Sequence, residues 1–171
     1  MPKTIQTTVY LYAELPTETA KARARSWWLE GQEDAFAFEG IEEDARTVGL
    51  KIVSLDTHRS NKGSFEDSAP ETAENITAQH GAECGTHKTA KAYLANLESL
   101  GDRPSDSHDD AGDSAWEDAR EDMDNNFLAA LLEDYRVMLD REIEYQQSEE
   151  YLAGNMKANE YTFTEDGKRF G

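Results

Sequence analysis

The chain has 171 residues, and its 36 Asp and Glu against 17 Lys and Arg give a formal net charge of -19 at pH 7. This composition excludes a phosphate-binding surface of the usual basic kind, because proteins that neutralise nucleic-acid or membrane phosphates need clustered lysines and arginines. The single cysteine excludes an internal disulfide, and the 37% of hydrophobic residues can fill one core. We expect a single cytosolic domain over residues 1–171, without a transmembrane segment.

The first third of the chain predicts two strands and two helices. Residues 4–12 and 50–57 alternate and are rich in β-branched and aromatic side chains, so we expect them to pair as strands. Helices are expected over residues 17–31 and 34–48, the first with Thr17 as its N-cap. At least one of the two indoles near the end of the first helix should lie in the core.

The middle of the chain predicts a strand, two helices and a loop. Residues 64–66 are a candidate third strand. Ser68 and Glu71 have the spacing of a capping box, which predicts a helix up to residue 80. The next helix is expected over 86–100. Residues 102–114, rich in Asp and Ser with a proline, are expected to be a flexible acidic loop.

The last third predicts the longest element. An apolar stripe begins near residue 115 and continues to about residue 147. It predicts a helix of about 30 residues, which is about 45 Å long at 1.5 Å per residue. Ser148 is expected to cap a short helix, residues 160–164 to form a strand and residues 165–167 a turn. The expected fold class is α+β, a small and mostly antiparallel sheet of three to four strands packed with five to six helices.

Three stretches of sequence carry a family resemblance. They are Tyr10-Leu11-Tyr12 with Trp27-Trp28, His80-Gly81 with Tyr93-Leu94, and, most specifically, Leu132-Glu133-Asp134-Tyr135 with Glu160 to Gly167. Together they resemble a group of small acidic proteins encoded by bacteriophages and prophages, some of them loosely labelled antitoxin-like. The resemblance implies a phage gene expressed in a bacterial cytoplasm, and it implies no particular activity.

His80, Cys84 and His87 have ligand types and spacing that can bind zinc. A structural zinc site needs four ligands, and neither of the other two histidines is close in sequence. We therefore favour the interpretation that His80 caps a helix end, Cys84 is a small buried hydrophobe and His87 lies on the surface in a first helical turn. No metal and no cofactor is expected.

The acidic loop is the basis of a second hypothesis about metals. Starting from Asp106, the calcium-loop pattern fails at its third position, His108, and at its sixth, Ala111. A solvated loop is the favoured interpretation, and a metal-dependent hydrolase that uses this loop is the third-ranked function. The sequence contains no nucleophile elbow and no phosphate-binding loop. We therefore expect a protein that is not an enzyme.

The acids around the start of the long helix form the main candidate site. Residues 102–124 hold ten acids and two arginines, a net charge of -8. On a helix, acids three or four positions apart lie roughly 5 to 6 Å from each other, which is comparable to the spacing of phosphates along a nucleic-acid strand. The predicted partner-binding residues are Glu117, Asp118, Glu121, Asp122 and Asp124 on the helix, with Asp109, Asp110 and Asp113 before it. The alternative is a charged, solvated helix face.

The leading hypothesis is a non-enzymatic phage protein that mimics nucleic acid. It would block a basic host defence protein with a nucleic-acid-binding groove, in the manner of an anti-CRISPR or anti-restriction protein. The runner-up is an antitoxin-like or scaffold protein that binds its partner through the apolar face of the long helix. We expect no direct binding to nucleic acid or membranes, and a homodimer is left open.

Overall fold

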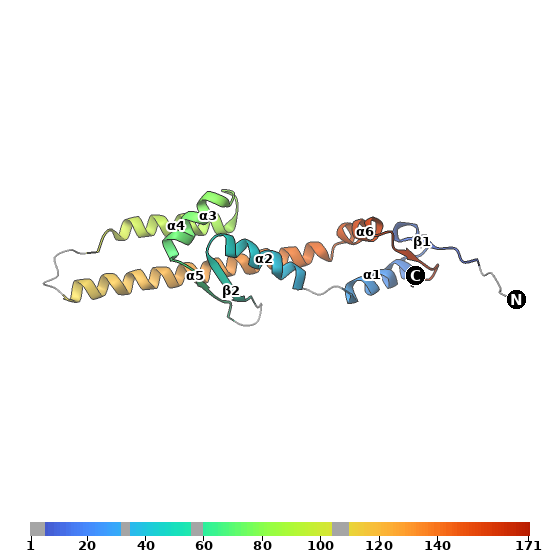
Figure 1. Ribbon diagram of the computed structural model, residues 1–171, viewed down its shortest axis with the longest axis horizontal. Coiled ribbons are helices and arrows are strands. Elements are labelled where there is room, and N and C mark those ends of the chain that lie inside the picture. Colours follow the sequence, from blue (N-terminus) through green and yellow to red (C-terminus); the bar gives the residue numbers. More distant parts are fainter. Residues whose placement is uncertain (1–5, 32–34, 56–59, 104–109) are drawn as a thin grey trace. The chain divides into compact units, whose positions relative to one another are not determined.

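The computed structural model describes residues 6–31, 35–55, 60–103 and 110–171, without the side chains of residues 35, 36, 110 and 111. Over these residues the chain is α+β, with six α-helices and two small antiparallel sheets of three and two strands (Figure 1). This confirms the predicted fold class. The chain divides into two compact units, the terminal unit (residues 1–36 and 141–171) and the central unit (residues 37–140).

The terminal unit combines both ends of the chain. Its elements are β1 (Tyr10–Leu11), the 3-10 turn η1 (Tyr12–Glu14), α1 (Glu18–Glu30), α6 (Glu149–Ala158), β4 (Thr162–Phe163) and β5 (Arg169–Phe170). The strands form one antiparallel sheet in the order β1-β4-β5. The N-caps follow the sequence prediction, since the side-chain oxygens of Thr17 and Ser148 accept hydrogen bonds from the backbone of α1 and α6.

The predicted pairing of residues 4–12 with residues 50–57 is wrong. β1 pairs with β4, and Tyr10 lies opposite Phe163. The other strand pairs with its neighbour in the chain, which follows after a short connection and so costs less loop-closure entropy. The first strand has aromatic partners at the far end of the chain, and Tyr12 packs edge-on against Phe163 with ring centroids 6.5 Å apart.

The core of the terminal unit lies between α1, α6 and the sheet. From α1, Ala20, Ala24 and Trp28 are buried at helical spacing. They pack with residues from the other elements of the unit, namely Tyr12, Leu15, Leu152, Met156 and Phe163. The prediction of a core indole is confirmed by Trp28, while Trp27 packs partly buried against this core.

The turn between β4 and β5 lies tightly against α1. Gly167 has a φ of +82°, and a Cβ built on it would lie 2.0 Å from the carbonyl oxygen of Ala20. Glycine is required here by both the backbone conformation and the close approach. Arg23 and Asp166 also join α1 to this turn, with 2.9 Å between Nη1 and Oδ2.

The central unit holds the other helices and the second sheet. Its elements are α2 (Ala35–Thr47, from residue 37 onward), β2 (Leu50–Ser54), β3 (Lys62–Phe65), α3 (Ala69–Gln79), α4 (Gly85–Leu100) and α5 (Asp110–Gln146, up to residue 140). β2 and β3 are antiparallel, with Leu50 opposite Phe65. The predicted third strand and the predicted helices are confirmed, and Ser68 caps α3 by accepting a hydrogen bond from Glu71 N.

The predicted loop over residues 102–114 is too long, because α5 begins at Asp110. Asp and Ser residues resemble a loop by composition, but acids in a first turn also stabilise the positive end of a helix. Arg103 holds this region by binding Asp113, and the Trp116 indole donates to the carbonyl oxygen of Gly101 at 3.3 Å. The remainder of the predicted loop, residues 104–109, lies outside the described residues.

The first half of α5 is covered on one side by α4 and by the β2–β3 hairpin. The ring of Phe127 on α5 stacks between Tyr93 of α4 and Phe65 of β3, with centroid distances of 4.2 and 5.6 Å. A Cβ on Gly63 would lie 2.8 Å from Cδ2 of Leu132, so the hairpin backbone lies directly against α5. One side of α5 is therefore core, and the other side is free to carry charge.

Candidate acidic interface

The negative charge is concentrated in the central unit. Residues 37–140 hold 24 acids and 9 lysines and arginines, a net charge of -15. The terminal unit holds 12 acids and 8 lysines and arginines, a net charge of -4. The electrostatic attraction for positive charge is therefore stronger at the central unit.

Asp124 lies on the inner side of α5. Its Oδ1 accepts a hydrogen bond from the Tyr93 hydroxyl at 2.5 Å and pairs with Nε of Arg120 at 3.0 Å. The side chain is only partly exposed. Asp124 thus connects α5 to α4, and the predicted straight row of Glu117, Glu121 and Asp124 does not present three free carboxylates.

Asp113 and Glu117 share one arginine. The Arg103 guanidinium binds Asp113 through two hydrogen bonds of 2.5 and 2.6 Å and lies 2.8 Å from Glu117. The hydrogen bonds from Arg103 lower the pKa of the Asp113 carboxyl, which keeps it ionised. This pairing fixes the end of α4 to the start of α5, and it partly neutralises the charge of Glu117.

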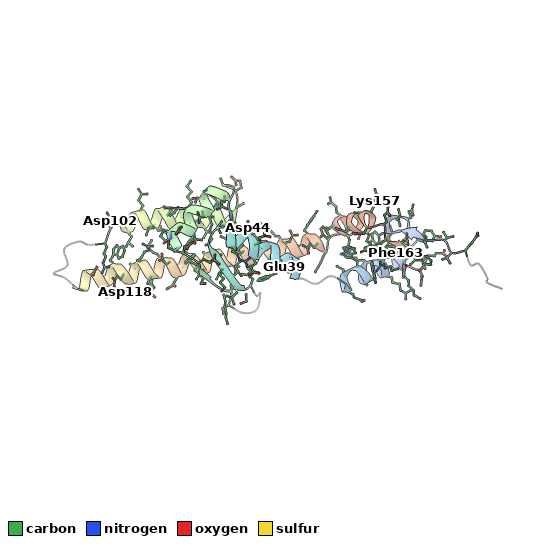
Figure 2. All side chains as sticks on the ribbon, viewed as in Figure 1. Glu39, Asp44, Asp102, Asp118, Lys157 and Phe163 are labelled. Atoms are coloured by element: carbon green, nitrogen blue, oxygen red, sulfur yellow. The ribbon has the colours of Figure 1, made fainter. Side chains whose placement is uncertain are left out.

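Asp118, Glu121 and Asp122 are different, and we call these three residues the acidic face. All three are exposed, and none of their side chains forms an ion pair or hydrogen bond with another described residue. Figure 2 labels Asp118 on the first half of α5. Positions three and four apart on a helix are neighbours, so the three carboxylates form one negatively charged patch.

Two of the eight predicted partner-binding residues lie at the edge of the described part of the chain. Asp109 lies outside the described residues, and Asp110 is described only as the first residue of α5. Of the other six, three make up the acidic face and three are engaged with arginines of the central unit.

The candidate zinc ligands have separate surroundings. His80 is the C-cap of α3, as predicted, and His87 lies in the first turn of α4. Cys84 is the exposed N-cap of α4, so the expectation that it is buried is wrong. Within the described ranges, no three His, Cys, Asp or Glu side chains come close enough to hold a metal ion.

His80 belongs instead to a polar cluster that the sequence does not reveal. Its Nδ1 lies 2.8 Å from the Thr86 hydroxyl, and its Nε2 lies 3.6 Å from Oδ2 of Asp44. The Tyr135 hydroxyl donates to the same Asp44 oxygen at 3.0 Å. These four residues come from α2, α5 and the junction of α3 with α4, so no local pattern could have predicted the cluster.

This cluster contains a carboxylate, an imidazole and a hydroxyl, the groups of a nucleophilic triad. Thr86 is only 1% exposed, however, so a substrate cannot reach its hydroxyl. His80 Nε2 is buried without a hydrogen-bond partner. We interpret the cluster as a connection between helices, because each of its members bridges two elements of the central unit.

Comparison with known proteins gives no match to a family model, to a curated protein or to a solved structure. Among the helices that the structure describes, none is both long enough and apolar enough to cross a membrane.

Proposed function

We propose that this chain is a non-enzymatic interaction protein whose acidic face occupies the nucleic-acid-binding groove of a basic partner. The observation that carries the proposal is the exposure of three unpaired carboxylates, Asp118, Glu121 and Asp122, on one helix of a unit with a net charge of -15. Such a patch accelerates association with a basic protein through long-range attraction.

The rigidity of the helix supports this proposal. Behind the acidic face, α5 is fixed to α4 by the bond of Tyr93 to Asp124 and by the stacking of Tyr93 on Phe127. The three carboxylates therefore project at fixed intervals from a helix that is packed against α4. Less conformational entropy is lost on binding than for acids in a flexible segment.

The resemblance to phage-encoded acidic proteins suggests the class of partner. Host defence nucleases of the CRISPR and restriction types hold nucleic acid in basic grooves, and a phage gains when such a groove is blocked. In this setting the protein acts in the bacterial cytoplasm and binds no nucleic acid itself, because its charge repels phosphates.

A capture experiment tests the proposal. The intact protein is immobilised, incubated with bacterial lysate at low salt and washed with duplex DNA as a competitor. We expect DNA to release a basic, nucleic-acid-binding protein, because both ligands occupy one groove.

The matched variants are Asp118→Asn with Glu121→Gln and Asp122→Asn, and a control with Glu150→Gln, Glu160→Gln and Glu165→Gln. The control removes three exposed acids that likewise have no partner among the described residues. Capture should fail for the first variant and persist for the control. Capture that resists DNA and persists in both variants would contradict the proposal.

A second candidate function follows from a hollow on the α4–α5 surface. It has a volume of about 350 Å³ and lies beside the stacked rings of Tyr93 and Phe127. Its wall is mainly apolar and includes Met123 and Ala130. A scaffold or antitoxin-like protein could bind a partner's apolar side chain here. Substituting Ala130→Arg would then abolish a capture that is insensitive to salt.

A further inference from the structure

A hollow in the terminal unit concentrates positive charge in an otherwise acidic chain. It has a volume of about 490 Å³ and lies between α1 and the turn that leads into β5. Arg23, Lys168 and Arg169 contribute cationic groups to its wall, Trp27 contributes an indole and Glu30 a carboxylate. The residues that line this hollow belong to the terminal unit, whereas the acidic face belongs to the central unit.

Arg169 is held in place by aromatic rings. Its guanidinium carbon lies 5.0 Å from the ring centroid of Trp27 and 4.8 Å from that of Tyr161. The two rings are themselves packed edge to face at 5.4 Å. Cation–π contacts of this kind hold a guanidinium without using its N–H donors.

Arg169 also has no anionic partner among the described residues. Six of the eight arginines in the described part of the chain have a carboxylate within 4 Å. In a chain with 36 acids and 17 lysines and arginines, a fixed arginine without a carboxylate is an exception. Its donors therefore remain available for an external oxyanion.

The other cations of the hollow are partly neutralised. Asp166 lies 2.9 Å from Arg23 and 3.7 Å from Lys168, so the two cations share one carboxylate. The hydroxyl of Thr164 donates to Asp166 and contributes most to lowering the pKa of that carboxyl. Asp166 therefore stays ionised beside the hollow, paired with two of the cations in its wall, and Glu30 is the acid in the wall itself. Three cations and two carboxylates give this region a net charge of +1, which one further negative charge would neutralise.

We propose that this hollow binds the carboxylate of an acidic side chain on a peptide segment of a protein partner. The planar fork of a guanidinium matches a carboxylate in two parallel hydrogen bonds. A nucleic acid does not fit, because stable phosphate binding uses several contacts and the surrounding unit has a net charge of -4. One carboxylate on a largely neutral segment meets the charge that the hollow offers.

Side-chain NMR tests the proposal directly on the intact protein. The probe is a blocked Gly-Glu-Gly tripeptide, with blocked Gly-Gln-Gly, sodium chloride and inorganic phosphate as comparisons. We expect the Nε–Hε signal of Arg169 and the indole signal of Trp27 to shift saturably with the Glu peptide. The Gln peptide and salt at equal ionic strength should not produce this shift.

Variants separate this site from general attraction. Arg169→Gln should abolish the saturable shift of Trp27, and Arg169→Lys, which keeps the charge but loses the fork, should weaken it about tenfold. Arg141→Gln removes the other described arginine without a carboxylate and should leave the shift unchanged. Equal shifts with both peptides, binding that survives Arg169→Gln, or phosphate binding at least tenfold tighter than the Glu peptide would each overturn the proposal.

Discussion

Three buried or largely buried tyrosines donate hydrogen bonds to carboxylates from distant parts of the chain. Tyr12 binds Glu149 at 2.7 Å, Tyr93 binds Asp124 at 2.5 Å and Tyr135 binds Asp44 at 3.0 Å. Each pair connects two elements within one unit. Two of these carboxylates also have an arginine within 4 Å, Arg25 beside Glu149 and Arg120 beside Asp124, so the tyrosine hydroxyl adds a second donor to each of them.

Removing one of these hydroxyls should be measurable. Tyr135→Phe should lower the free energy of unfolding in urea by about 1.5 to 3 kcal/mol, the usual loss for a hydrogen bond to a charged group. Tyr145→Phe is the control, because Tyr145 is 52% exposed and its hydroxyl has no hydrogen bond to a described residue. Its effect should stay within about 0.5 kcal/mol. Equal losses in the two variants would show that the hydroxyl of Tyr135 contributes nothing specific.

The same tyrosines predict a loss of stability at high pH. Burial raises the pKa of Tyr12, Tyr93 and Tyr135 above the ordinary value of 10.0. Above about pH 10 the unfolded chain releases these protons first, so the stabilisation is complete below pH 10 and declines as the pH rises. Each tyrosine adds a slope of about 1.4 kcal/mol per pH unit. Urea unfolding between pH 9 and 11 should show this decline in the free energy of unfolding. In Tyr135→Phe the slope should be smaller by the contribution of one tyrosine. A free energy of unfolding that does not change with pH would contradict the prediction.

Among secondary-structure elements, the sequence predicts what is decided locally. The N-caps at Thr17 and Ser68 and the third strand depend on residues that are close in the chain, and all are confirmed. The pairing of β1 with β4 depends on aromatic packing between residues at opposite ends of the chain. Local sequence patterns therefore do not predict it.

The candidate site was predictable to the same degree. The sequence locates the acids at the start of α5, and helical spacing correctly makes Asp118 and Asp122 neighbours. The inward orientation of Asp124 depends on the position of Tyr93, which is set by the packing of α4 on α5. That packing joins residues 31 positions apart, so sequence periodicity alone does not distinguish Asp124 from the exposed acids.

The turn before β5 supports a prediction about glycine. Gly167→Ala should destabilise the terminal unit by more than about 2 kcal/mol, because the added methyl group would overlap the backbone of Ala20 at a positive φ. Gly154→Ala in α6 is the matched control, since nothing lies within 4 Å of its Cβ position. That change should stabilise the helix by about 0.5 to 1 kcal/mol. Unfolding in urea, followed by the fluorescence of the tryptophans, measures both; a neutral Gly167→Ala would contradict the tight approach.

At the scale of the whole molecule, charge is distributed unequally. The central unit has a net charge of -15 and the terminal unit -4, and the terminal unit also contains Arg169, which has no carboxylate partner among the described residues. The two proposals therefore assign opposite kinds of contact to different units. In the first proposal the central unit attracts a basic groove, and in the second the terminal unit accepts a single carboxylate.

Neutralising the acidic face should leave the fold intact. Exposed charges contribute little to stability, and removing three like charges from a unit of net charge -15 relieves repulsion. We expect the variant with Asp118→Asn, Glu121→Gln and Asp122→Asn to unfold in urea at a midpoint equal to or higher than that of the parent. A loss of more than about 1 kcal/mol would mean that these side chains serve the fold.

The most direct test of the central claim is the association rate with the basic partner recovered by capture, measured at about 50 and about 300 mM salt. At low salt, the variant that lacks the acidic face should associate at least about tenfold more slowly than the parent, because long-range steering is lost. The control variant with Glu150→Gln, Glu160→Gln and Glu165→Gln should change by less than about twofold, and high salt should remove most of the difference. Equal slowing in both variants would assign the effect to net charge alone, and unchanged rates in both would contradict a role for the acidic face.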